Sequence, residues 1–157
     1  MAIEFTKETL EEFNDILKRY PEKQAATIPA LYLIQRDFGF VSDDALEYLA
    51  GLLDLPVSAV HNTISYYTMF YREEMGKYVI QVCSTLSCSI LGSKDILTHI
   101  ENKLGIKAGE TTQDKKFSIL KVECLGSCGT APVMRVNDEY YEDLTQDKID
   151  DILDKLT

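Results

Sequence analysis

The sequence is poor in basic residues, and it lacks several patterns that would assign a function directly. Its 157 residues include 16 Lys and Arg against 26 Asp and Glu, so the formal net charge is -10. Nucleic acid and anionic membrane surfaces would repel such a chain, and neither is an expected partner. The sequence also has no G-x-G-x-x-G run, phosphate loop or flavin motif, so no nucleotide site is expected on it.

Long apolar runs are also missing. No stretch approaches the roughly 20 apolar residues that span a bilayer, so no direct membrane insertion is expected. The first residues show no basic region followed by an apolar stretch, so they do not resemble a secretory signal. We therefore expect a cytoplasmic protein, either free or peripheral on the cytoplasmic face of a membrane complex. Stable disulfides are rare in that compartment.

What the sequence does have is a globular composition, with 45% apolar and 27% charged residues. The acidic excess lies mostly in the first half: residues up to Gly76 include 6 basic and 13 acidic side chains, and the remainder 10 and 13. This surface is interpreted either as a solvated face or as a docking face for a basic partner.

Residues 1–75 are expected to form a four-helix bundle that docks on a larger partner protein. Thr6 and Ser42 are predicted N-caps, and Gly39 is a predicted helix end. The four apolar stripes at helical spacing are Leu10, Phe13, Leu17 and Tyr20; Ile28, Leu31, Ile34 and Phe38; Leu46, Leu49 and Leu53; and Val57, Val60, Ile64 and Tyr67.

Residues 76–157 change to β-branched runs, so a second domain is expected there. Strands are predicted over 78–82 and 117–122, with a helix between them that starts near Ser89 or Ser93 and ends at Gly105. A hairpin follows over 133–141, and Thr145 caps a last helix. The order βαβ then ββα predicts an α/β, thioredoxin-like domain with parallel first strands.

All four cysteines fall in this second half, as Cys83-x4-Cys88 and Cys124-x3-Cys128. Each pair follows a predicted parallel strand, so both pairs leave the same edge of the sheet and can converge. Backbone amides at Gly126 and Gly129 are expected to approach the sulfurs, as is a helix N-terminus at Ser89. Hydroxyls from Ser84, Ser87 and Ser127 are further expected donors.

Four cysteines at one site could serve several purposes. Zinc would give a structural or interaction module, but zinc ribbons favour C-x2-C at both ends. Two disulfides conflict with the expected compartment. A dithiol enzyme would need C-x-x-C in the first loop. A binuclear cluster is wider than one ion and suits the longer spacings, so iron-sulfur is favoured.

The two cysteine motifs, with Cys124-Leu125-Gly126-Ser127-Cys128 in the second, resemble the thioredoxin-like [2Fe-2S] ferredoxin family. The likeness includes the stretches 64–70 and 129–133 and covers nearly the whole chain, as in the small two-iron subunits of bacterial NADH:quinone oxidoreductase, respiratory complex I. The resemblance implies one [2Fe-2S] cluster, held by Cys83, Cys88, Cys124 and Cys128. It also implies that Pro132 is the cis proline of thioredoxin-like folds.

The resemblance further implies a redox subunit without a catalytic site of its own. Its expected partners are a flavoprotein subunit that binds FMN and NADH, and further iron-sulfur subunits of the same complex. A hydride carries two electrons and an iron-sulfur centre accepts one, so the flavin would split the pair. Related subunits serve complex I, NAD-linked hydrogenases, formate dehydrogenases and electron-bifurcating enzymes, and the motifs do not separate these parent complexes.

Overall fold

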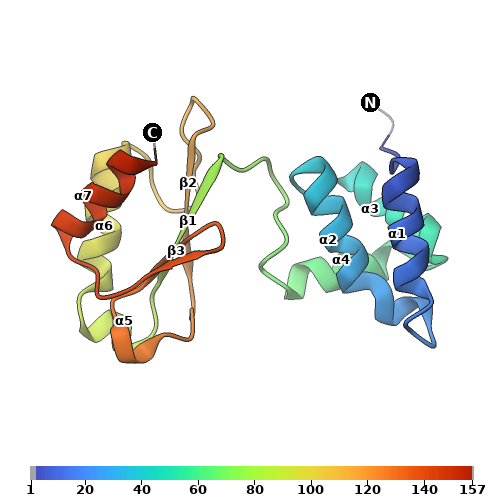
Figure 1. Ribbon diagram of the computed structural model, residues 1–157, viewed down its shortest axis with the longest axis horizontal. Coiled ribbons are helices and arrows are strands. Elements are labelled where there is room, and N and C mark those ends of the chain that lie inside the picture. The colour runs from blue at the N-terminus through green and yellow to red at the C-terminus, as the bar shows by residue number, and fades with distance from the viewer. Residues whose placement is uncertain (1–2, 157) are drawn as a thin grey trace. The chain divides into compact units, whose positions relative to one another are not determined.

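The protein is described by a computed structural model, which covers residues 3–156. Its contacts divide the chain into two compact units, Met1–Glu74 and Met75–Thr157. Figure 1 shows the first unit as helical and the second as a sheet with helices beside it. Among the described residues, no helix combines the length and the apolar character that a membrane span needs.

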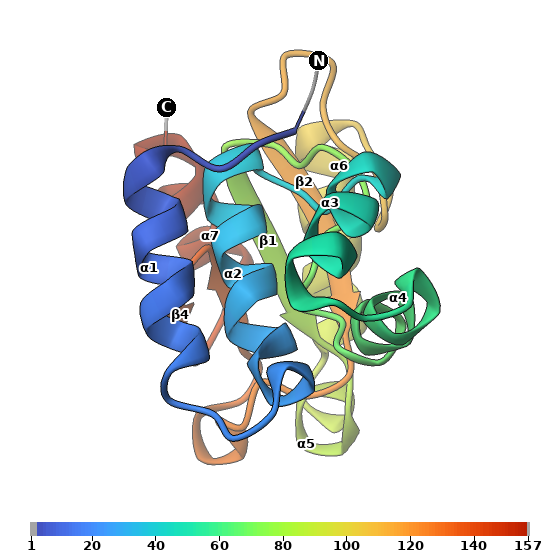
Figure 2. The same cartoon turned by 90° about the vertical axis from the view of Figure 1, so that its right-hand side faces the viewer.

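From residue 3 onward, the first unit contains four α-helices and one short 3-10 helix. Thr6 Oγ1 accepts a hydrogen bond from Thr9 N at 3.1 Å, and Ser42 Oγ accepts one from Ala45 N at 3.2 Å, which confirms both predicted N-caps. In Figure 2, α1 and α2 lie side by side. The elements are α1 Lys7–Leu17, η1 Lys23–Ala26, α2 Thr27–Phe38, α3 Asp43–Leu53 and α4 Val57–Tyr66.

The predicted apolar face of α1 is confirmed at Phe13, which is buried, and at Leu17, which packs against the core, but it is wrong at Leu10. Leu10 is 37% exposed, whereas Thr9, Phe13 and Ile16 are buried. A hydrogen bond accounts for the burial of Thr9. Thr9 Oγ1 donates to Asp37 Oδ2 on α2 at 2.7 Å, so the face of α1 that carries Thr9 points towards α2. Tyr20, also predicted to be inside, follows the end of the helix and is 38% exposed.

The second unit is built on a four-stranded sheet in the order β2-β1-β3-β4. β1 and β2 pair in parallel and the other neighbours pair antiparallel, as predicted for a βαβ unit followed by a hairpin. The strands are β1 Tyr78–Cys83, β2 Phe117–Val122, β3 Met134–Val136 and β4 Glu139–Tyr141, and the helices are α5 Leu86–Ile90, α6 Ser93–Leu104 and α7 Gln146–Lys155.

The core of this unit lies between the sheet and α6 and α7. Ile80 and Val82 of β1 pack with Ile100 of α6 and Ile149 of α7, and all four are almost fully buried. Figure 1 shows α6 and α7 together on one side of the sheet. This packing fixes β1, whose last residue is Cys83.

The predicted crossover helix is confirmed with its start at Ser93: α6 runs from Ser93 to Leu104 and ends at Gly105. The short separate helix α5 before it was not predicted. Gly92 joins α5 and α6 with a φ of 92°, a conformation that glycine adopts without strain. As a result Cys88 lies within α5 rather than in a loop before the helix.

A polar clip joins α6 to α7 on the outside of this core, and it consists of His99, Lys103, Asp150 and Asp154. His99 Nε2 and Lys103 Nζ each lie 2.9 Å from Asp150 Oδ1. Lys103 Nζ also lies 2.9 Å from Asp154 Oδ1. His99 therefore has a structural partner, in keeping with the lack of a metal motif around it in the sequence.

The clip predicts a pH dependence of stability. Hydrogen bonds from Lys103 and His99, and their charges, lower the pKa of Asp150 from its ordinary value of 3.8. A lowered carboxyl pKa contributes stability that is complete above the unfolded pKa and is lost as the pH falls through the folded one. We expect Asp150→Asn to lower the midpoint of urea unfolding at neutral pH, and the difference from wild type to shrink as the pH falls below 3.8.

Asp151→Asn is the matched control, because Asp151 is exposed on the same helix. The same loss of stability in both variants would attribute the effect to net charge and contradict the role of the clip.

Candidate functional site

The four cysteines lie at the end of the sheet where the parallel strands β1 and β2 finish. Cys83 is the last residue of β1, and Cys88 lies in α5 just after it. Cys124 and Cys128 flank the loop that follows β2. Cys83 and Cys88 are buried, Cys124 and Cys128 are exposed, and all four are free thiols.

The two buried thiols interact directly. The Cys88 thiol donates a hydrogen bond to Cys83, and the nearby charges of Cys83 and Cys128 act to raise the pKa of Cys88. Within residues 3–156, no three His, Cys, Asp or Glu side chains converge as they would around a single metal ion.

The two buried thiols differ in acidity. Burial acts to raise the pKa of Cys83, but hydrogen bonds from the backbones of Thr85 and Leu125 and from the Cys88 thiol lower it overall. Burial raises the pKa of Cys88, and its hydrogen bond to Cys83 raises it further. Because thiolates are the metal-binding form of cysteine, Cys83 is the more readily available ligand of this pair.

Backbone amides approach two of the sulfurs. Gly126 N lies 3.3 Å from Cys124 Sγ, as predicted, with Gly126 at a φ of 79°. The backbone N–H of Leu125 donates to the sulfur of Cys83. This hydrogen bond links the loop that carries Cys124 and Cys128 to the end of β1. Leu125 also packs against the two buried cysteines together with Val133. Hydrogen bonds of this kind stabilise negative charge on sulfur.

The prediction that serine hydroxyls donate to the sulfurs is wrong for Ser84 and Ser127, and for Ser87 it stays a prediction. Ser84 Oγ donates to Val122 O at 2.9 Å and Ser127 Oγ bonds Glu142, so both hydroxyls have partners other than a sulfur. The hydroxyl next to a sulfur belongs to Thr85, whose Oγ1 lies 3.7 Å from Cys83 Sγ, although this hydroxyl donates to Glu123 O. Thr85 was not among the predicted donors, although its position two residues after a candidate ligand could have indicated it.

A family model for the thioredoxin-like [2Fe-2S] ferredoxins matches residues 13–157. The chain belongs to that family. The Ala131–Pro132 peptide bond is cis, as expected from the resemblance to thioredoxin-like folds.

Curated relatives match over nearly the full length of the chain. The E subunit of NADH-quinone oxidoreductase from Rickettsia conorii is 46% identical, over 97% of this chain and 93% of its own. NADH dehydrogenase [ubiquinone] flavoprotein 2, mitochondrial, of Dictyostelium discoideum is 40% identical over 98% of this chain and 63% of its own. By name, both relatives belong to NADH-oxidising oxidoreductases.

Among solved structures, an NAD+-reducing [NiFe]-hydrogenase shares the fold, with a TM-score of 0.72 and 22% identity. The match covers 83% of this ferredoxin-family chain and 22% of the hydrogenase chain. At that identity the likeness concerns the fold alone.

Hydrogen bonds between hydroxyl groups and a carboxylate anchor the loop that carries Cys124 and Cys128. Glu142 accepts hydrogen bonds from Ser127 Oγ and from Thr130 Oγ1, the latter at 2.8 Å. Ser127 Oγ and Thr130 Oγ1 are themselves 2.9 Å apart, and Asp143 N donates to Thr130 O at 2.7 Å. The segment after β4 is therefore tied to the loop between Cys124 and Cys128.

Removal of this anchor should loosen the loop. We expect Glu142→Ala to release iron to a chelator faster than wild type, because Ser127 and Thr130 lose their common acceptor and the loop samples more conformations. Glu142→Gln, which keeps an acceptor oxygen, is expected to be intermediate. The control is Glu139→Ala on the neighbouring strand, and equal release from both alanine variants would contradict an anchoring role.

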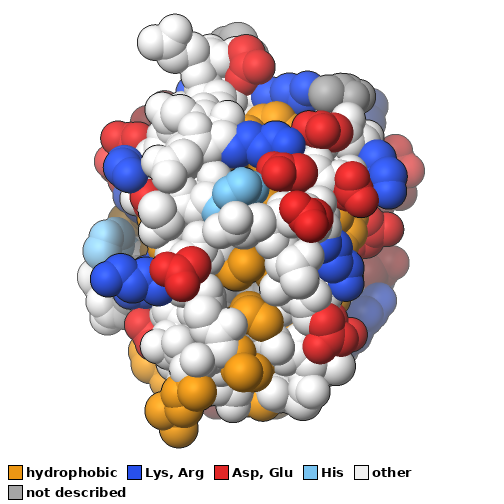
Figure 3. Space-filling view, turned by 90° about the vertical axis from the view of Figure 1, so that its left-hand side faces the viewer, with side chains coloured by type: hydrophobic (Ala, Val, Ile, Leu, Met, Phe, Trp, Pro, Cys, Tyr) orange, Lys and Arg blue, Asp and Glu red, His pale blue; other side chains and the backbone are white. Residues whose placement is uncertain are grey.

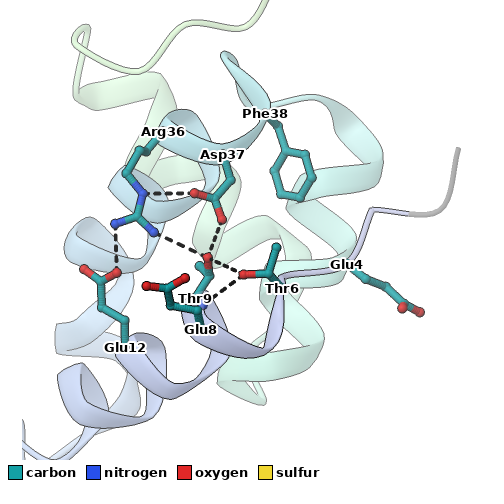
Figure 4. Close-up of a pocket in the computed structure, with 8 residues that line it drawn as sticks. All are labelled: Glu4, Thr6, Glu8, Thr9, Glu12, Arg36, Asp37 and Phe38. Carbon is teal, nitrogen blue, oxygen red and sulfur yellow. Dashed lines mark hydrogen bonds and ion pairs between the residues drawn. The ribbon is translucent and has the colours of Figure 1, made fainter.

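A hollow also lies on the first unit, between α1 and α2, with a volume of about 460 Å³. Figure 4 shows Arg36 between Glu12 and Asp37, whereas Glu4 points away from it. Arg36 Nη1 lies 2.8 Å from Glu12 Oε2, and Arg36 Nε lies 2.9 Å from Asp37 Oδ1. The contacts are those of a structural ion-pair network that joins the two helices.

Proposed function

We propose that this chain is an electron-transfer subunit of an NADH-dehydrogenase-type complex. The observation that carries the proposal is the full-length similarity to an E subunit of NADH-quinone oxidoreductase, combined with four free cysteines at one sheet edge. In this proposal Cys83, Cys88, Cys124 and Cys128 hold the cofactor of the family. Bound to these thiolates, a [2Fe-2S] cluster supplies a centre that changes by one electron.

The chain's own groups fit that cofactor in three respects. The ligands come as two pairs, one buried and one exposed. Amides of Leu125 and Gly126 donate to sulfurs, where they stabilise added negative charge and so favour reduction. Val133, 1% exposed, and Leu125 exclude water on the inner side of Cys83 and Cys88.

The exposed surface of α5 supports docking of a partner at this end of the unit. Leu86 and Ile90 are 75% and 73% exposed, and Leu91 next to the helix is 57% exposed. Figure 3 shows hydrophobic side chains gathered at the lower edge of the second unit, the end at which α5 lies in Figure 1. Exposed apolar side chains on the helix that carries Cys88 suit a docking contact through which electrons pass.

We propose that the partner is a flavoprotein subunit with FMN and NADH, within a complex that holds further iron-sulfur subunits. The flavin would divide the two electrons of a hydride, and this chain would exchange one of them. The helical first unit would dock as a bundle, in keeping with Tyr32 and Tyr66, which are 49% and 80% exposed. Such a complex would place the chain on the cytoplasmic side.

The test is electron paramagnetic resonance on anaerobically purified protein, with iron and zinc measured on the same sample. We expect about two irons per chain and a signal that appears on reduction with dithionite. NADH alone should not produce the signal, but NADH with the flavoprotein subunit should. One zinc per chain without a signal would contradict the proposal and leave the structural zinc module.

A further inference from the structure

A cavity lies on the other side of Cys83, between α6 and the ends of β1 and β2. Its volume is about 360 Å³, within the range of small-molecule sites. Only Cys83 among the four cysteines lines it, so it is distinct from the space between the two cysteine loops. The lining residues are Val82, Cys83, Ser84, Ser89, Ser93, Lys94, Leu97, Thr98, Glu101 and Lys121.

Ser93 is the unusual polar group of this cavity. It is the first residue of α6 and is only 5% exposed, yet its hydroxyl has no hydrogen-bond partner within residues 3–156. The residue before it, Gly92, offers no side chain to cap the 12-residue helix. Arg135 Nε is the one fully buried side-chain polar atom without a partner among the described residues, so the Ser93 hydroxyl opens to the cavity, where it can donate to a ligand.

The backbone at the same place offers further donors. Asp95 N and Ile96 N donate to Gly92 O, whereas the described contacts give the amides of Ser93 and Lys94 no acceptor. Free amides at the start of a helix, together with the positive end of its dipole, favour an anion.

The charges around the cavity have the matching sign. Lys94 and Lys121 line it, and neither forms an ion pair within the described part of a chain whose net charge is -10. Lys94 lies in the first turn of α6, where its charge opposes the helix dipole; Asp95 in the same turn favours the dipole but does not line the cavity.

The one carboxylate in the lining is already occupied. Glu101 Oε2 lies 2.8 Å from Lys107 Nζ, and Glu101 Oε1 accepts from Ala108 N at 3.0 Å. The same contacts hold the pKa of Glu101 below its ordinary value, so it remains a paired anion. Lys94 and Lys121 are therefore left to set the charge of the cavity.

We propose that this cavity binds a small molecule through a phosphate or carboxylate group. The oxyanion would lie at the N-terminus of α6, where the Ser93 hydroxyl and the free amides donate to it and Lys94 and Lys121 neutralise it. The apolar side chains of Val82 and Leu97 would form a wall for the rest of the molecule. This proposal does not depend on which cofactor the four cysteines hold.

The test is equilibrium dialysis of the full-length protein, as purified, at low salt against labelled inorganic phosphate and, separately, labelled succinate. We expect one saturable site per chain for at least one of the two anions. Lys94→Glu should abolish the binding. Ser93→Ala should weaken it by about tenfold, because a hydrogen bond to a charged group is lost.

Lys155→Glu is the control, because it makes the same change of charge at an exposed position on α7. Tighter binding of phosphate would assign the site to phosphate groups, and tighter binding of succinate to carboxylates; both support the site. Circular dichroism would check that each variant is folded, and Lys121→Ala provides a milder second variant. The absence of saturable binding for both anions, or an equal loss in Lys94→Glu and Lys155→Glu, would overturn the proposal.

Discussion

Replacement of Cys124 by alanine is expected to abolish the visible absorption and the paramagnetic signal of a bound cluster while the second unit remains folded. Cys124 is exposed, and its sulfur accepts a hydrogen bond from Gly126 N in its own loop, so it contributes little to the core. A [2Fe-2S] cluster with four cysteine ligands that loses one thiolate is expected to lose most of its iron. Iron content, absorption and circular dichroism measure the three effects.

Alanine is chosen over serine because a serine oxygen can still act as a ligand. The matched control is Ser87→Ala, since Ser87 lies between Cys83 and Cys88 and is not a proposed ligand. A Cys124→Ala protein with undiminished iron and spectrum would show that the four-cysteine assignment is wrong, even if the family membership stands.

Cys83→Ala tests the same four-cysteine assignment at a buried cysteine. Cys83 is 4% exposed, accepts hydrogen bonds from two loops and packs with Val133. Its replacement is therefore expected to remove the cluster and also to lower the stability of the unit. The contrast between Cys83 and Cys124 separates the binding of the cofactor from the packing of the fold.

The placement of the cysteines could be predicted because it depends on topology. Strand β1 ends at Cys83 and the parallel strand β2 ends two residues before Cys124, so chain order and a βαβ crossover suffice to bring both pairs to one edge. Caps at Thr6, Ser42 and Thr145 were predictable for a similar reason, since each bonds an amide three residues ahead.

Features that depend on a choice between tertiary contacts could not be predicted in this way. Ser127 could bond a sulfur or a carboxylate, and it bonds Glu142, which is 15 residues away in sequence. Thr9 is polar, yet its hydrogen bond to Asp37 makes it a buried residue of α1 in place of Leu10. In both cases the partner is distant in the chain, and periodicity gives no information about it.

Replacement of Gly76 by alanine is expected to destabilise the second unit strongly. A Cβ atom at this position would lie 2.7 Å from Phe117 C and 2.9 Å from Phe117 N, which are backbone atoms of β2 and cannot rotate away. Gly76 N also donates to Ser118 Oγ at 2.7 Å, in the buried side chain next to Phe117. Overpacking of this kind costs about 1–3 kcal/mol, and a clash with backbone belongs at the upper end of that range.

The consequence extends to the candidate site because Gly76 precedes β1, which pairs with β2 from Tyr78 to Cys83. A shift of β2 away from residue 76 would disturb the parallel register that brings Cys83 and Cys124 to one edge. We therefore expect Gly76→Ala to lower the free energy of unfolding and to retain less iron. Gly51→Ala in α3 is the control, because its added methyl meets no atom within 4 Å and alanine favours a helix by about 0.5–1 kcal/mol. If Gly76→Ala unfolded at the same urea concentration as wild type, the close approach of Gly76 to β2 would not be a constraint on the fold.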